Sequence, residues 1–294
     1  MSTHRLIPAV LAGLVDDAAV FPPGCAELPE AVAAHREHRA AWYADLVGPL
    51  LLPASALLAG PMPATLREAE PLAAGIVGDT GLADLAAAVA APPPGLRVRQ
   101  VEYAVAKRGQ DPQPGLDRFV DRLAGWPGLA GYAEIPLTWG LSRALDTVAA
   151  ARAGGLPVAG KFRTGGLAAE LFPTPVELAA VICGCRDRHI PYKLTAGLHH
   201  AVRQADPETG FVHHGFLNVL AADVLADRGG EVADVAEALA ATDAVPLVEL
   251  SRARRDAGRP LWRGFGSCSV REPLTDLVRL GLINGGYEIN GGYQ

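Results

Sequence analysis

The chain has 294 residues, of which 50% are hydrophobic and 20% are charged, so it can bury a large core. This composition argues against an intrinsically disordered protein. The formal net charge is −6 and no basic tract occurs, which argues against nucleic acid as a main partner because phosphate contacts need clustered cations.

Apolar runs of strand length alternate with helical segments in the first half of the chain. The run from Leu11 to Phe21, interrupted by Asp16 and Asp17, indicates a helix or a first strand, which we count as Leu14–Val20. Further strands are predicted at Leu46–Pro53, Ala73–Gly78 and Arg97–Val105. Helices are predicted at Leu28–Ala44, from Thr65 to Ala69, at Gly81–Ala91 and at Leu116–Leu123.

The second half continues the alternation and ends with a longer helical section. Strands are predicted at Gly131–Leu137, Pro157–Arg163, His189–Thr195 and Pro260–Gly266. Helices are predicted at Ser142–Gly154, Thr174–Arg188, Gly215–Asp227, Glu231–Ala241, Pro246–Ala257 and Glu272–Leu280. Three of these helices fall between the last two strands.

Strands this apolar are buried on both faces, which is typical of a parallel sheet covered by helices. Counting the first run gives about eight strands, the number that a (β/α)8 TIM-type barrel needs. We therefore predict one barrel domain over residues 1–294, with a helical insertion between strands 7 and 8. A doubly wound open sheet is the alternative. Neither glycine-rich nucleotide-binding motif occurs, so nucleotide binding has no support.

Lysine occurs only at Lys107, Lys161 and Lys193, and two of the three end neighbouring predicted strands. In a barrel, catalytic groups lie where strands end, and neighbouring strands lie about 4.8 Å apart. Lys161 shares its side of the strand with Arg163, and acidic residues lie within two earlier strands, at Glu102 and Glu134.

Two neighbouring ammonium groups disfavour each other's charge, and burial acts in the same direction. We therefore expect a depressed pKa for Lys161 or Lys193, which is the condition for an amine that forms a Schiff base with a carbonyl. One alternative is a structural ion network in which Glu102 and Glu134 neutralise the cations. Another is a charged clamp that holds a phosphate or carboxylate of the substrate.

Three stretches of the second half resemble the last three strands of the deoxyribose-phosphate aldolase group. They begin at Lys161 (Lys-Phe-Arg-Thr-Gly), at Lys193 (Lys-Leu-Thr-Ala-Gly) and at Gly264 (Gly-Phe-Gly-Ser-Cys-Ser). The resemblance implies that Lys161 is the Schiff-base lysine, that Lys193 activates it, and that Gly266–Ser269 receive a phosphate. The chain departs from the family at Arg163, at the pair His199 and His200, and in the long section between strands seven and eight.

A second resemblance begins near the N-terminus. The Phe-Pro-Pro turn at 21–23, the Thr-Ala-Gly-Leu-His-His stretch at 195–200 and the Gly-Phe-Leu-Asn segment at 215–218 resemble a widespread bacterial family of about this length. This resemblance implies no activity.

Half of the eight histidines lie close together, at His199, His200, His213 and His214. With Glu134, Asp16 or Asp17 they could hold a divalent metal, although no His-x-His or His-Glu-x-x-His spacing occurs. Otherwise one histidine is a general acid or base beside the lysines, or the histidines only cap helices and loops. We expect no cofactor and leave a divalent metal open.

The turn formed by Gly266, Ser267 and Ser269 leads into the last predicted helix. Small residues before a helix N-terminus expose backbone N–H groups that suit an anion, and barrels often bind phosphate near strands 7 and 8. The alternative is an ordinary tight turn with a serine cap. Asp16 and Asp17 are either catalytic acids at the end of the first strand or a solvated loop pair.

Together these features predict a Schiff-base-forming lyase or aldolase acting on a small, polar, phosphorylated or unphosphorylated carbonyl compound. Lys161 is the expected nucleophile and Lys193 its partner, while Glu134 and His199 or His200 move protons. The remaining expected site residues contact substrate: Arg163, Glu102, Asp16, Asp17, His214, Gly266, Ser267 and Ser269. The alternatives are a metal-dependent isomerase or hydrolase and a non-catalytic small-anion-binding protein.

The four cysteines match no zinc-binding spacing, so we interpret them as reduced thiols of a cytoplasmic protein. No apolar stretch is long enough to span a membrane, and no membrane partner is expected. Association into a homo-oligomer is left open.

Overall fold

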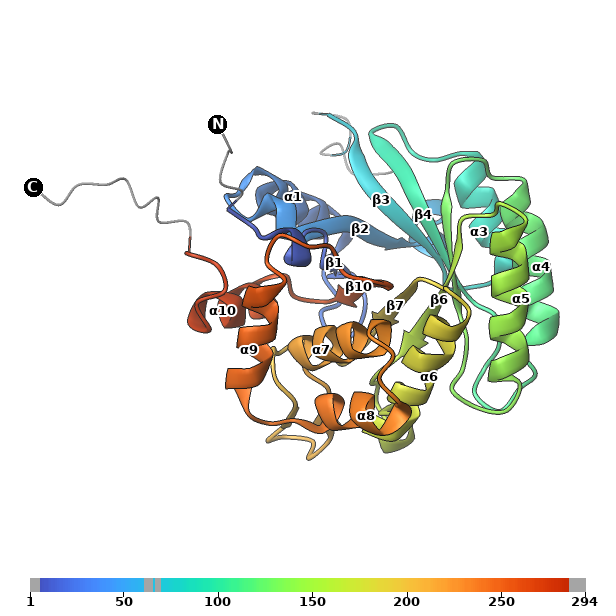
Figure 1. The fold of residues 1–294 in the computed structure, drawn as a ribbon. Helices are drawn as coiled ribbons and strands as arrows, with labels where there is room; N and C mark the ends of the chain where they lie inside the picture. Colours follow the sequence, from blue (N-terminus) through green and yellow to red (C-terminus); the bar gives the residue numbers. More distant parts are fainter. Residues whose placement is uncertain (1–5, 61–65, 67–69, 286–294) are drawn as a thin grey trace, which may run out of the picture.

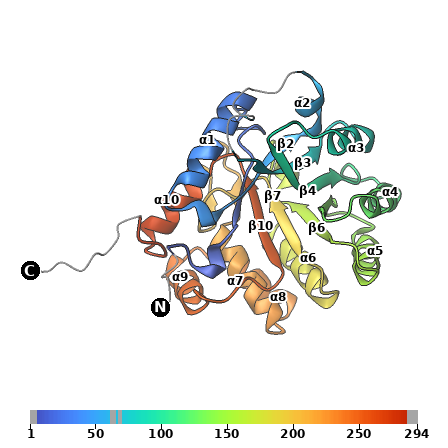
Figure 2. The same cartoon turned by 90° about the horizontal axis from the view of Figure 1, so that it is seen from above.

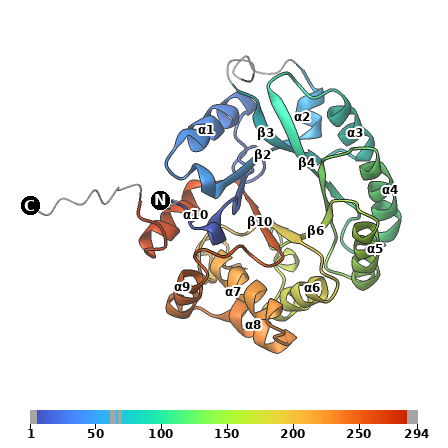
Figure 3. The same ribbon diagram turned by 45° about the horizontal axis from the view of Figure 1, so that its top comes forward.

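The computed structural model describes residues 6–60, 66 and 70–285, and eight strands of this part of the chain close into a parallel barrel (Figure 3). The strands, in chain order, are β1 (Val15–Asp17), β2 (Val47–Pro53), β3 (Leu72–Gly78), β4 (Leu96–Ala104), β5 (Ala130–Glu134), β6 (Val158–Arg163), β7 (Tyr192–Thr195) and β10 (Trp262–Ser267). Each pairs with its neighbour in the chain, and β1 closes the ring by pairing with both β2 and β10.

Helices follow the strands and surround the ring on its outside (Figures 1 and 2). They are α1 (Leu28–Ala40), α2 (Ala54–Leu58), α3 (Leu82–Ala90), α4 (Gln113–Ala124), α5 (Leu141–Ala153), α6 (Pro175–Asp187), α7 (Phe216–Asp227), α8 (Val232–Ala240), α9 (Ala244–Ala253) and α10 (Arg271–Arg279). The predicted (β/α)8 TIM-type fold is confirmed, and the open-sheet alternative is wrong because the sheet has closed on itself.

The section between β7 and β10 contains a short antiparallel hairpin followed by α7, α8 and α9. The hairpin joins β8 (Gln204–Ala205) to β9 (Val212–His213). Helix α8 packs against both α6 and α7, so this section continues the outer layer of helices around the barrel.

Most predicted boundaries lie close to the observed ones, with informative differences at the N-terminus. Strand β1 ends at Asp17 rather than Val20, because the Asp17 carboxylate accepts a hydrogen bond from the N–H of Ala19 and turns the chain. Helix α2 was not predicted, because its five residues, Ala54–Leu58, are too few to show a helical period. The helix predicted from Thr65 to Ala69 lies, except for Leu66, outside the described residues.

Alternation along the barrel strands separates an apolar outer layer from a polar interior. On β6 and β7 the fully buried Phe162 and Leu194 belong to the hydrophobic core, and the lysines next to them in sequence point into the ring. At the opposite end of the barrel the partly buried guanidinium of Arg259 donates hydrogen bonds to five backbone carbonyls, those of Val10, Ala12, Gly13, Trp262 and Arg263. Within the described residues, no helix is long and apolar enough to cross a membrane.

Candidate active site

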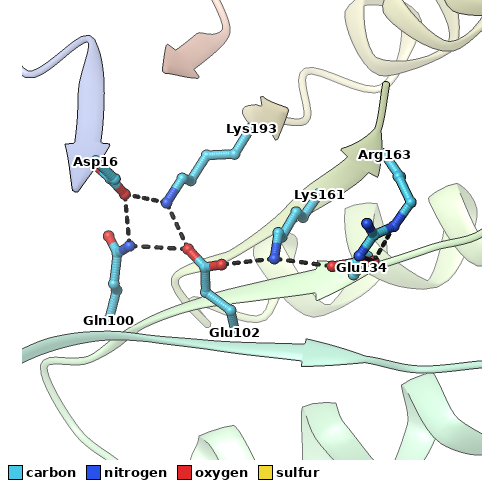
Figure 4. A network of polar contacts seen from close by, with 7 residues as sticks. All are labelled: Asp16, Gln100, Glu102, Glu134, Lys161, Arg163 and Lys193. Atoms are coloured by element: carbon cyan, nitrogen blue, oxygen red, sulfur yellow. Dashed lines mark hydrogen bonds and ion pairs between the residues drawn. The ribbon is translucent and has the colours of Figure 1, made fainter. Parts of the chain in front are cut away.

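A chain of alternating charges fills the barrel interior toward the ends of the strands (Figure 4). It runs through Asp16 on β1, Lys193 on β7, Glu102 on β4, Lys161 on β6, Glu134 on β5 and Arg163 on β6. Each carboxylate contacts one or two cations, and each lysine contacts two carboxylates. Six residues on five strands therefore form one network.

Glu102 is the centre of the network and is fully buried. One of its oxygens, Oε1, lies 2.6 Å from Nζ of Lys193, and the other, Oε2, lies 2.8 Å from Nζ of Lys161. Lys161 also contacts Oε2 of Glu134 at 2.9 Å, and Lys193 also contacts Asp16. Glu102 thus separates two ammonium groups that would otherwise repel each other.

Strand register produces this geometry. Lys161 lies opposite Lys193 across the β6–β7 pair, and Glu134 lies opposite Lys161 across the β5–β6 pair. In-register residues on neighbouring strands point to the same side of the sheet, so these three side chains meet inside the ring. The predicted proximity of the two lysines is confirmed.

Three residues that support the network were not singled out from the sequence. The amide of Gln100 donates hydrogen bonds to Asp16 and Glu102, at 2.9 and 3.0 Å, and the Tyr132 ring centroid lies 4.6 Å from Nζ of Lys193. Gly48 makes room for Asp16, because a β-carbon there would lie 1.9 Å from Oδ1 of that carboxylate. Gln100 and Tyr132 each lie two residues before a predicted site residue, and strand alternation could have identified them.

The electrostatics overturn the expectation of a depressed lysine pKa. Burial lowers the pKa of Lys161, but Glu102 and Glu134 outweigh it and raise that pKa above its ordinary value. Lys193 behaves in the same way, with Asp16 and Glu102 outweighing burial. The repulsion between the two ammonium groups is only one of the charge effects at this site. Each ammonium also contacts two carboxylates, and their attraction raises the lysine pKa.

The carboxylates respond to the same contacts. Burial alone would raise the pKa of Glu102, but the attraction of the two lysines outweighs burial and lowers this pKa to about 2. The pKa of Glu134 is also lowered, because Lys161 and Arg163 outweigh its burial. Burial raises the pKa of Asp16 despite the attraction of Lys193, and the neighbouring Glu102 charge adds to the rise.

Exposure increases along the network toward Arg163. The side chains of Glu102, Lys193 and Lys161 are 0%, 3% and 6% exposed, while those of Glu134 and Arg163 are 16% and 45% exposed. Glu134 and Arg163 line a cavity of about 310 Å³ that the loops after β4, β5 and β6 surround. A ligand in this cavity therefore meets Glu134 and Arg163 first, with the Lys161 ammonium directly behind Glu134.

Asp17, His199 and His200 lie outside the charged network. Asp17 is buried on the other side of β1, where its carboxylate contacts Nδ1 of His35 at 2.9 Å. Nδ1 of His199 contacts Glu272 at 2.8 Å and Nδ1 of His200 contacts Asp276 at 3.1 Å, so both side chains join the loop after β7 to α10. Among the described contacts, neither histidine bonds to the lysine network.

His214 also has a structural environment. It is buried, its Nε2 donates to the carbonyl of Pro173 at 2.8 Å, and its Nδ1 lies 3.2 Å from a guanidinium nitrogen of Arg203. Burial lowers its pKa to about 4, so the imidazole is neutral at pH 7. Nδ1 therefore accepts from Arg203, and His214 holds the loop after β7 against the loop before α6.

The serines of the turn at 266–269 are occupied by the turn itself. The Ser267 hydroxyl donates to the carbonyl of Ser269 at 2.8 Å and lies 3.3 Å from the N–H of Ser269. The Ser269 hydroxyl accepts from the N–H of Glu272 at 3.2 Å. Gly266 lies in β10, in register with Thr195 and Asp16. These contacts match the alternative of a tight turn with a serine cap.

Within the described residues, no group of three or more His, Cys, Asp or Glu side chains is arranged to hold a metal ion. No protein-family model, curated protein or solved structure matches the chain.

Proposed function

We propose that the protein is a lyase or aldolase that forms a Schiff base between Lys161 and a small polar carbonyl compound. The observation that carries this proposal is the position of Lys161. It is a buried amine whose Nζ lies 2.9 Å from Glu134, and Glu134 lines the cavity at the mouth of the barrel. A nucleophilic amine needs a base within hydrogen-bond reach, and Glu134 meets that requirement.

Lys161 is a better candidate for the nucleophile than Lys193. Lys193 is enclosed by Asp16, Glu102 and the ring of Tyr132, deeper in the barrel. Two of the three N–H groups of the Lys161 ammonium are directed to Glu102 and Glu134, which leaves one for a ligand. Lys193 therefore acts as a positioning residue that holds Glu102 in place.

The raised pKa of Lys161 means that it rests as an ammonium and must lose a proton before it reacts. Glu134 takes that proton. The neutral amine then adds to the carbonyl carbon, and its own N–H proton moves to the carbonyl oxygen, giving a carbinolamine. The protonated Glu134 returns its proton to the hydroxyl, which leaves as water while the nitrogen lone pair forms the iminium bond.

Cleavage uses the same carboxylate as a base. Glu134 removes the proton of the substrate's β-hydroxyl, which becomes the carbonyl of the released fragment. The bond between the α and β carbons breaks, and its electron pair moves into the iminium to give an enamine. Protonation of the enamine carbon by Glu134, followed by addition of water, releases the second fragment and restores the amine.

A non-catalytic small-anion-binding protein is the second candidate. The observation that favours it is the raised pKa of both lysines, which keeps two permanent cations in the barrel. Such a protein would bind an anion by ion pairs and hydrogen bonds and would form no covalent adduct.

Trapping experiments separate the two candidates. Borohydride reduction in the presence of a panel of aldehydes and ketones is expected to add the mass of a reduced adduct to the native protein. Lys161→Arg keeps a cation between Glu102 and Glu134 but cannot form the adduct, so it is expected to gain no mass. Lys193→Arg keeps the nucleophile and is expected to be modified. A broad panel that leaves the folded native protein unmodified would rule the proposal out.

A further inference from the structure

The cavity beside Glu134 has three walls of different character. The loop after β4 contributes Lys107 and Arg108, and the end of β5 continues into the apolar residues Ile135 and Leu137. The loop after β6 and the first turn of α6 form the third wall, which includes the acidic residues Glu170 and Glu177. Lys161 and Lys193 belong to the charged network and Lys107 lines the cavity, so all three lysines of the chain lie in or beside this end of the barrel.

Two of the three acids in the lining are already engaged. Glu134 holds Lys161 through one oxygen and Arg163 through the other. The Glu177 carboxylate accepts hydrogen bonds from the backbone N–H and hydroxyl of Thr174, at 2.7 and 2.9 Å, with a weaker attraction from Arg108. Glu170 is the remaining acid, and its side chain is exposed.

The cations on the other wall are not engaged in the same way. Lys107 and Arg108 are exposed, and neither forms an ion pair with another residue of the described chain. Arg163 uses Nε and Nη2 on one oxygen of Glu134, at 3.3 and 3.1 Å, so the rest of its guanidinium remains available to the cavity.

We propose that Lys107, Arg108 and Arg163 form a subsite for an oxyanion at the far end of the substrate. The substrate class is then a short carbonyl compound with a carboxylate or phosphate a few bonds from the carbonyl. This inference rests on the proposed function for the carbonyl end. The anion then lies above β4 and β6 and not at the turn at 266–269, where the N–H groups of Ser269 and Glu272 already donate to serine hydroxyls.

The cavity also limits the size of the substrate. Its volume of about 310 Å³ is at the lower end of the ~300–1,000 Å³ that ligand pockets occupy. Ile135, Leu137 and Leu171 form an apolar stretch of the wall that suits a short carbon chain between the carbonyl and the anion.

Direct binding tests the subsite independently of Schiff-base chemistry. Calorimetric titration of the native protein with inorganic phosphate and with butanoate is compared with the double variant Lys107→Ala/Arg108→Ala. The matched control is Arg97→Ala/Arg99→Ala, which removes two exposed cations from the other end of β4. Of phosphate and butanoate, the anion that the native protein binds more tightly is expected to bind the subsite variant about tenfold more weakly for each charge-assisted hydrogen bond that is lost. The control variant is expected to bind it as tightly as the native protein does. Equal affinity in all three proteins would overturn the subsite.

Reductive trapping then compares butanal with 4-oxobutanoate and 3-oxopropyl phosphate. The native protein is expected to be trapped at lower concentrations of the anionic aldehydes than of butanal, and the subsite variant is expected to lose that preference. Whichever anionic aldehyde is trapped at the lower concentration shows whether the subsite prefers a carboxylate or a phosphate. Equal trapping of all three aldehydes would overturn the subsite and leave the proposed function intact. Anion binding that the subsite variant loses, without trapping of any aldehyde, would overturn the proposed function and leave the subsite intact.

Discussion

Replacing Glu102 with glutamine tests whether the buried network is held together by charge. Glu102 contacts both lysines, at 2.6 and 2.8 Å, and its pKa falls from 4.5 to about 2 in the folded protein. At about 1.4 kcal/mol per pKa unit, the ionised form is favoured by about 3 kcal/mol. Glu102→Gln removes that charge and leaves two buried ammonium groups with less compensation, a change that costs about 3–5 kcal/mol in comparable buried pairs.

Urea denaturation followed by circular dichroism at pH 7 measures the free energy of unfolding of Glu102→Gln and of the native protein. We expect a loss of about 3 kcal/mol or more. Because the pKa of Glu102 is depressed, its contribution is full above pH 4.5 and disappears as the pH falls toward 2, so the difference between the proteins should narrow in acid. Glu249→Gln, an exposed control, should change the free energy by less than about 0.5 kcal/mol. A loss below about 1 kcal/mol for Glu102→Gln would refute the ionic account of the barrel interior.

Three further predictions concern residues outside the network. The pKa of His214 is about 4, against an ordinary 6.5, so the free energy of unfolding should be highest above pH 6.5 and fall by about 3 kcal/mol as the pH drops to 4. In urea titrations at several pH values, His214→Gln should reduce this fall in the free energy of unfolding. Gly48→Ala places a β-carbon 1.9 Å from Oδ1 of Asp16, so it should destabilise the protein by about 1–3 kcal/mol in the same assay. Gly60→Ala, whose β-carbon would meet no atom of the described residues within 4 Å, should not. Arg259→Lys removes the planar guanidinium that donates to five carbonyls, so it should lower the melting temperature. The rate of aldehyde trapping should stay the same, and a slower rate would show that the two ends of the barrel are coupled.

Much of the fold could be predicted because the apolar runs and the helical segments alternate with clear boundaries. Pro175 in the first turn of α6 and Gly154 after α5 mark helix ends that lie within one residue of the predicted positions. The short hairpin β8–β9 could not be predicted, since two-residue strands leave no periodicity to detect. Strand β1 was predicted too long because its end depends on a hydrogen bond to the Asp17 side chain rather than on hydrophobicity.

The charged network was predicted only in part, because Asp17, the histidines and the turn at 266–269 were expected in the same site but have other partners. Strand alternation brought Lys161, Lys193, Glu102 and Glu134 to one interior, and the structure joins them in one network. The direction of the lysine pKa shift depends on which contacts are shortest, and that is a property of register and rotamers which the sequence does not specify. The histidines were grouped by their closeness in sequence, but their partners lie mostly on α10 and in loops.

The proposed function requires Lys161 to be the reactive amine of this site. Peptide mapping of the native protein after reductive trapping tests it most directly, because the chain has lysine only at positions 107, 161 and 193 and these lie far apart in sequence. The proposal predicts that the reduced adduct is found on Lys161. An adduct confined to Lys193 or to the exposed Lys107 would contradict it.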